Sequence, residues 1–210
     1  MRMHMVAAAL VFSPVAVAAP TGPEFGFRAA FSRPFGESVG DGSRGGLSLR
    51  DVVRGGIPIW LDLGYRFAPE FYAGVSGSFG LLFPNGCDAS DRCSGQDVRL
   101  GLDLRFHLAP SAAIDPWIGV GAGYEWLMLS ASPGGQDQEL TLQGIEFFNV
   151  QMGVDFLAVP RFRLGPFVGF SLGRYTEGSA SSGLVSASGP IANARVHEWL
   201  LLGLRAAFNP

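Results

Sequence analysis

Strict alternation of apolar and polar residues over positions 96–108, QDVRLGLDLRFHL, constrains this chain more than any other feature. The even positions from Val98 to Leu108 are all apolar, whereas the odd positions carry charges, glycine and histidine. Because successive side chains of a strand point to opposite faces, the stretch predicts a β-strand with one apolar and one charged face. A soluble sheet covers its apolar face with a second layer, but no stretch of helical period is present to supply one.

The same alternation occurs eight times along the chain. The predicted strands occupy 24–32, 57–67, 70–83, 96–108, 116–129, 148–156, 164–173 and 197–208. Residues 144–147, just before the sixth stretch, break the parity, which predicts a β-bulge there.

The connections between these strands alternate in length. After the second, fourth and sixth strands they are short, whereas after the first, third, fifth and seventh they are long and polar, at 33–56, 84–95, 130–140 and 176–195. Antiparallel neighbours joined in this way place all short turns at one end and all long loops at the other. The prediction is an all-β fold, an eight-stranded antiparallel up-and-down transmembrane β-barrel. The alternative is a soluble lipocalin-like barrel, which would bury the apolar face inside.

The first residues predict export. Residues 1–19 combine Arg2, an apolar run from Val6 and the small residues Ala16-Val17-Ala18, the layout of a secretory signal peptide. The apolar run is shorter than the roughly 20 residues of a spanning helix, and no later run reaches that length. We therefore expect a signal peptide at 1–19 and the barrel at 20–210.

An exported chain enters an oxidising compartment, and this one has two cysteines. Cys87 and Cys93 are separated by five residues rich in turn formers, so we expect a disulfide that closes this loop. The alternative is a metal clip in which Asp88 and Asp91 join the two thiolates.

The charged faces predict the content of the barrel. Eight strands leave an interior only wide enough for side chains to fill, and unpaired charge there is costly. We therefore expect a closed, paired ion network, with inward glycines making room for Trp60, Tyr72, Phe167 and Trp199. Its expected members are Glu24, Arg28, Asp62, Arg66, Asp97, Arg99, Asp103, Arg105, Glu125, Asp155 and Arg205.

Motifs for catalysis or cofactors are weak. The sequence around Ser171 matches G-x-S-x-G, but the nucleophile elbow needs a strand-to-helix turn and this motif lies within a predicted strand. His107 and His197 both point inward, without the spacing of metal ligands. We expect no catalytic, cofactor or metal site. With a pI near 5.6 and no basic cluster, nucleic acid is not an expected partner.

The last predicted strand ends in LLLGLRAAF, with Gly203, Ala206 and the aromatic Phe208. With the eight alternating stretches, it resembles the small eight-stranded outer-membrane barrels, the class of the outer-membrane protein A barrel and its W-type relatives. It departs from that class in having Asn209 and Pro210 after the aromatic residue. The resemblance implies a bacterial outer-membrane location, contact with outer-membrane lipid and recognition by the assembly machinery, and it does not carry over a ligand.

The expected function is that of a non-enzymatic integral barrel, most simply a monomer, that acts in envelope integrity or through surface contacts of its long loops. One alternative is a narrow conduit for small polar or hydrophobic solutes, and another is a lipid-modifying barrel enzyme. We expect extracellular loops and two girdles of outward aromatic residues. The girdle at the short turns comprises Phe67, Phe71, Phe106, Phe156, Phe162 and Phe208, and the other comprises Phe79, Phe83, Tyr124 and Trp126.

Overall fold

The computed structural model describes residues 21–39, 47–87, 92–133, 136–183 and 185–210. The predicted signal peptide at 1–19 lies outside these residues. Eight long strands make up most of the described chain. They are β1 (Gly22–Val39), β3 (Val53–Ala68), β4 (Phe71–Pro84), β5 (Cys93–His107), β6 (Ile114–Ala131), β7 (Gln138–Val159), β8 (Phe162–Ser182) and β10 (Val196–Phe208). Three short elements accompany them, β2 (Leu47–Ser48), α1 (Leu49–Val52) and β9 (Val185–Pro190).

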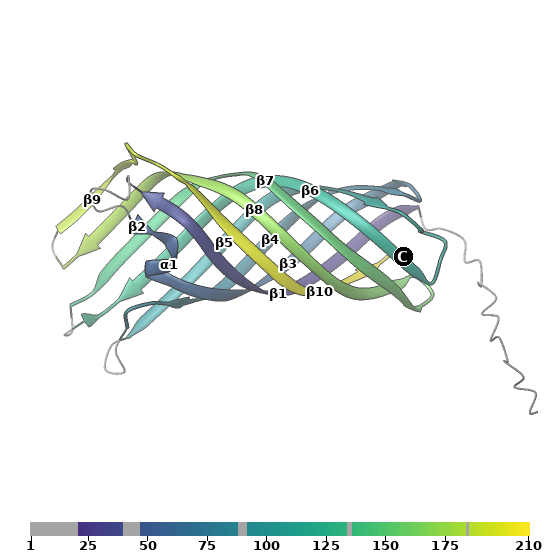
Figure 1. Cartoon of the computed structure of the whole chain (residues 1–210), viewed down its shortest axis with the longest axis horizontal. Coiled ribbons are helices and arrows are strands. Elements are labelled where there is room, and N and C mark those ends of the chain that lie inside the picture. Colours follow the sequence, from purple (N-terminus) through teal and green to yellow (C-terminus); the bar gives the residue numbers. More distant parts are fainter. Residues whose placement is uncertain (1–20, 40–46, 88–91, 134–135, 184) are drawn as a thin grey trace, which may run out of the picture.

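The long strands close into a ring, which confirms the predicted eight-stranded antiparallel barrel. Each pairs with its neighbour in sequence, and β10 closes the sheet by pairing with both β8 and β1 (Figure 1). The closing register sets Phe27 opposite Ala206 and Phe31 opposite Leu202. Closure leaves the barrel wall without a free edge, which a sheet in hydrocarbon requires because unpaired backbone groups there cost several kcal/mol.

The apolar faces point outward. Leu61, Leu102 and Leu202 expose 64%, 66% and 67% of their surface, while the charged residues beside them are buried in the lumen. A soluble barrel has the opposite polarity, so the lipocalin-like alternative is wrong. The outer surface is a continuous apolar belt, which matches the hydrocarbon of a membrane.

All short connections lie at one end, which we call the turn end, and the long ones lie at the other, the loop end (Figure 1). The predicted bulge is present in β7, where the pairing with β6 slips by one residue between Gly121 and Gly123. The chain ends just after β10, at the turn end.

The long connections contain more regular structure than the sequence predicted. β1 and β8 continue well into the stretches expected as loops, α1 folds within 33–56, and β9 extends the sheet beside β8. The predicted loop boundaries were wrong there because alternation fades at serine and glycine, although the backbone groups of these residues still pair across the sheet. As a result β6, β7, β8 and β9 project beyond the barrel as a four-stranded sheet, which we call the crown sheet.

Candidate functional site

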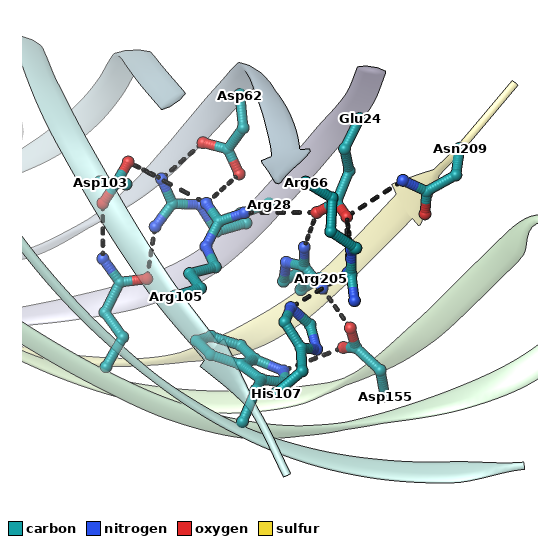
Figure 2. Close-up of polar contacts among 12 residues, drawn as sticks. Glu24, Arg28, Asp62, Arg66, Asp103, Arg105, His107, Asp155, Arg205 and Asn209 are labelled. Atoms are coloured by element: carbon teal, nitrogen blue, oxygen red, sulfur yellow. Dashed lines mark hydrogen bonds and ion pairs between the residues drawn. The ribbon is translucent and has the colours of Figure 1, made fainter. Parts of the chain in front are cut away.

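The lumen is the most highly organised part of the molecule, and its ionic side chains form three layers along the barrel axis. In the layer at the turn end, Arg66 and Arg205 both bind Glu24 at 2.6 Å. Arg205 also pairs with Asp155, and the indole of Trp117 donates to the same carboxylate at 3.0 Å (Figure 2). These residues come from five different strands, so the layer ties opposite walls of the barrel together.

The C-terminal residues seal this layer. The side-chain amide of Asn209 donates to Glu24 at 3.3 Å and to the carbonyl of Pro23 at 3.3 Å (Figure 2). Its backbone N–H donates to the carbonyl of Arg161 in the β7–β8 turn at 2.9 Å. Asn209, which distinguishes this C-terminus from the class pattern, therefore closes the lumen at the turn end.

His107 belongs to the same end. Its Nε2 lies 3.1 Å from an Arg66 nitrogen and its Nδ1 lies 2.8 Å from Asp115. Because arginine only donates, Nε2 accepts and the Nδ1 hydrogen goes to Asp115. Both nitrogens are therefore engaged in structural bonds, and His107 is fully buried.

The middle layer is built on Asp62, which binds Arg28 at 2.6 Å and Arg105 at 2.7 Å (Figure 2). Arg28 also reaches Asp103 at 3.2 Å, and Gln151 bridges the two by accepting from Arg28 and donating to Asp103. Two arginines and two carboxylates thus balance one another across β1, β3 and β5.

Aromatic rings and glycines fill the space between these charges. The guanidinium of Arg105 stacks 4.6 Å from the centre of the Tyr72 ring, which lies over Gly64 and Gly74. A Cβ at Gly74 would overlap the Tyr72 hydroxyl oxygen, so only glycine fits there. The expectation that inward glycines accommodate bulky rings holds at this position.

The layer nearest the loop end centres on Arg99. Its guanidinium contacts Asp97 at 2.8 Å, Glu146 at 2.7 Å and Glu125 at 3.2 Å. Glu125 also accepts from the Tyr175 hydroxyl at 2.6 Å and lies 3.0 Å from His197. One arginine therefore holds three carboxylates in a fully enclosed setting.

An apolar cluster covers this layer on the loop side. Its members, contributed by α1 and by the surrounding strands, are Leu49, Val53, Leu82, Leu127, Leu142, Tyr175 and Trp199. Leu49 and Val53 are completely buried, so the segment around α1 folds into the barrel mouth as a plug. Below it, a void between Arg28 and Arg99 measures about 30 Å³, room for one or two water molecules.

Next to the plug, the crown sheet, α1 and the start of the β4–β5 loop line a cup of about 610 Å³. Its lining is mainly apolar and comes from α1, the β4–β5 loop and β6 to β9. The apolar and small lining residues are Val52, Pro84, Leu129, Ala131, Leu140, Ala180, Val185 and Ala187. Val52, Leu129 and Leu140 also pack on the plug, so the floor of the cup is the top of the plug.

The structure buries all eleven residues expected in the ion network. Sequence reasoning missed Glu146, Asp115 and Arg163, which are buried among them. Glu146 lies in the bulge of β7, where the broken parity hid its inward direction. Asp115 and Arg163 lie at strand ends, just outside the stretches whose alternation was clear.

The G-x-S-x-G sequence around Ser171 does not form a nucleophile elbow. Ser171 is buried within β8, without a strand-to-helix turn, and accepts a hydrogen bond from Arg99 at 3.3 Å. His197 is stacked on Tyr175 at 4.0 Å and lies beneath the plug. Ser171 borders the void of about 30 Å³ between Arg28 and Arg99.

The predicted disulfide between Cys87 and Cys93 is present, with Cα atoms 6.4 Å apart. Both thiols are consumed by the bond, so the metal-clip alternative is wrong. Asp88 and Asp91, its other proposed ligands, lie outside the described residues.

No protein-family model matches the chain, and no curated protein is significantly similar to it in sequence. Solved structures do match. Neisserial surface protein A is 15% identical with a TM-score of 0.55, covering 90% of this chain and 97% of its own. A major outer membrane protein from Thermus thermophilus is 14% identical with a TM-score of 0.57, covering 89% and 98%. The outer membrane protein OprG from Pseudomonas aeruginosa is 15% identical with a TM-score of 0.50, covering 91% and 99%. The chain thus has the fold of small outer-membrane β-barrels.

Proposed function

We propose that this protein is a closed, non-enzymatic barrel of the bacterial outer membrane that acts through its loop end, which faces outward. The observation that carries the proposal is the filled lumen. In the described part of the chain, three layers of buried ion pairs cross the lumen, the plug around α1 covers them on the loop side, and Asn209 bonds across the turn end. This filling supports a closed barrel, and the crown at the loop end supports contacts made there.

The belt supports the membrane location. Apolar side chains cover the outside of every long strand, and outward aromatic residues such as Phe71, Phe106 and Phe208 are more than 40% exposed at the turn end. The proposal includes a cleaved signal peptide at 1–19 and insertion by the outer-membrane assembly machinery, which would read the C-terminal strand. It also includes a monomer, because the closed sheet needs no partner strand.

In this proposal the crown sheet makes the surface contacts, and the lining of the cup indicates what kind of molecule it binds. A concave site of about 610 Å³ with mainly apolar walls suits a small apolar molecule or an apolar side chain of a surface partner. Because the plug forms its floor, the cup would hold such a molecule at the surface. Passage of the molecule onward is the competing conduit function.

Binding of the dye N-phenyl-1-naphthylamine, whose emission rises in apolar surroundings, tests the cup. Leu140 lines the cup, and its neighbour Thr141 faces the opposite side of the crown sheet. We expect Leu140→Asn in detergent-solubilised protein to weaken binding roughly tenfold, the factor for losing one buried leucine contact. Thr141→Asn, the matched control, should bind as the parent does.

Two results would contradict the proposal. Equal binding by the Leu140→Asn and parent proteins would exclude the cup as a binding site. Faster entry of a small apolar solute into vesicles that contain the protein, compared with empty vesicles, would replace the closed barrel by the conduit.

A further inference from the structure

Three arginines continue the lipid-facing rows of their strands at the loop end. On β1 the outward row passes from Phe31 to Arg33, and on β8 it passes from Leu172 to Arg174. On β3 the row passes from Ile57 to Arg54 across the kink at Gly55 and Gly56. In each strand the arginine is the first charged outward residue beyond the apolar belt.

These arginines lie on one side of the barrel. β8, β10, β1 and β3 are consecutive in the sheet, whereas the charged residues of β5 and β6 point inward and β4 has none. The opposite side of the same rim is aromatic, with Phe79, Phe83 and Trp126. We call the residues Arg33, Arg54 and Arg174 the arginine arc.

The arc is exposed and unoccupied by protein groups. Within the described part of the chain, none of its three guanidinium groups makes an ion pair or a side-chain hydrogen bond. Two acidic residues lie nearby, Glu198 in the row of β10 and Asp51 in α1, but neither pairs with the arc. Arg50 adds a further positive charge above Phe35, 5.7 Å from its ring centre.

The position of the arginine arc relative to the apolar belt indicates what it binds. Arg33 and Arg174 lie two positions beyond Phe31 and Leu172, about 7 Å along the strand, and Arg54 lies three positions beyond Ile57. Each arginine therefore directly follows a residue of the apolar row. That is the depth of lipid head groups, which are the first polar groups the arc meets. A planar guanidinium with several donors matches phosphate oxygens in a bidentate manner, and it fits a zwitterionic or neutral group less well.

We propose that the arginine arc binds lipid head groups whose phosphate leaves them with a net negative charge, in the leaflet at the loop end and on the β8–β3 side only. Bound phosphates would fix that side of the barrel in its leaflet. The adjacent crown and cup would then stand at a defined height over the membrane surface.

Lipid retention tests this proposal. The parent is refolded into nanodiscs of phosphatidylcholine with phosphatidic acid, extracted into mild detergent and analysed by native mass spectrometry. We expect phosphatidic acid to be retained preferentially. The variant R33Q/R54Q/R174Q should lose this retention by roughly tenfold or more, the factor for even one charge-assisted hydrogen bond. R161Q, at the exposed turn-end residue Arg161, should retain it.

A gel comparison of heated and unheated samples first establishes that each variant is folded. Equal retention by the triple variant and the parent would overturn the proposal, as would equal retention of phosphatidylcholine. Complete displacement of the lipid by excess inorganic phosphate would also overturn it, because the arc would then be a site for the free ion. If the triple variant does not fold, Arg174→Gln alone decides by the same readout.

Discussion

At the scale of single residues, the stability of the lumen depends on how many oppositely charged partners each buried side chain has. Asp62 has two arginines, Arg28 and Arg105, whereas Asp97 and Glu146 depend on Arg99 alone among the described arginines. Removing one member of a buried ion pair leaves an uncompensated charge, which costs about 3 to 5 kcal/mol. The unfolding free energy lost when an arginine of the lumen is removed should therefore increase with the number of carboxylates that this arginine alone neutralises.

The first prediction concerns Arg99. Arg99→Ala leaves Asp97, Glu125 and Glu146 without their common partner. We expect the free energy of unfolding to fall by about 3 to 5 kcal/mol in urea titrations of the protein in lipid vesicles. Adding Asp97→Asn and Glu146→Gln to the same chain should recover part of the loss. Unfolding of Arg99→Ala at the parental urea concentration would refute the ion network as a structural element.

The second prediction compares Arg105 with Arg99. Arg105→Ala leaves Asp62 paired with Arg28 at 2.6 Å, so its effect should be the smaller of the two. The loss should come partly from the stacking on Tyr72, which an alanine cannot replace. The same urea titration measures the loss of unfolding free energy. A loss larger than that of Arg99→Ala would contradict the expectation that an arginine matters most where it is the sole partner of several carboxylates.

The third prediction concerns a glycine. Gly74→Ala would drive a methyl group into the Tyr72 hydroxyl oxygen and place it 2.6 Å from the carbonyl of Leu63, so the ring and the wall must shift. We expect a loss of about 1 to 3 kcal/mol in the same titration, the usual cost of overpacking. Gly80→Ala, where the nearest atom is 3.5 Å away, is the matched control and should unfold like the parent. A parental midpoint for Gly74→Ala would mean that Tyr72 is loosely held.

At the scale of elements, the barrel strands could be predicted from the sequence and the loop end could not. The period of two in 96–108 is decisive because lipid contacts one face and charges fill the other. In β9 no such contrast exists, since VSASGP has neither an apolar nor a charged face, and α1 spans only four residues, too few for a recognisable period. The burial of Leu49 in the barrel mouth depends on chain reversal in 33–56, which no local pattern encodes.

The pairing of charged side chains within the lumen likewise could not be predicted from the sequence. Inward direction follows from parity, but the partners of an inward charge depend on the stagger between strands. Arg28 and Gln151, for example, are bonded although 123 positions separate them. The bulge in β7 adds a further shift, and this is why Glu146 was missed.

The fourth prediction concerns the loop closed by Cys87 and Cys93. A ring of this size should reduce the entropy of the unfolded chain by about 2 kcal/mol at most in the loop-closure model, and it lies outside the barrel wall. We expect the Cys87→Ser and Cys93→Ser double variant to unfold near the parental midpoint but to be cut faster by protease between Pro84 and Gly95. A large drop in barrel stability would show that the loop supports the wall.

At the scale of the whole molecule, polarity is inverted relative to a soluble protein. Apolar residues face outward in a belt, and the core is ionic at both ends and in the middle, with aromatic rings between the layers. The ion pairs of each layer join strands across the lumen, and a void of about 30 Å³ lies between Arg28 and Arg99. The loop end carries the plug, the cup and the arginine arc.

Single-channel recording in a planar lipid bilayer tests the closed lumen most directly. The protein is inserted beside an empty-bilayer control, and a porin of known conductance establishes that insertion and detection work. The closed lumen predicts no stable conductance steps at any voltage that the bilayer withstands. Reproducible open steps from folded parent protein would contradict it, because ions could pass only if the layers at Arg205, Asp62 and Arg99 left a continuous water-filled path.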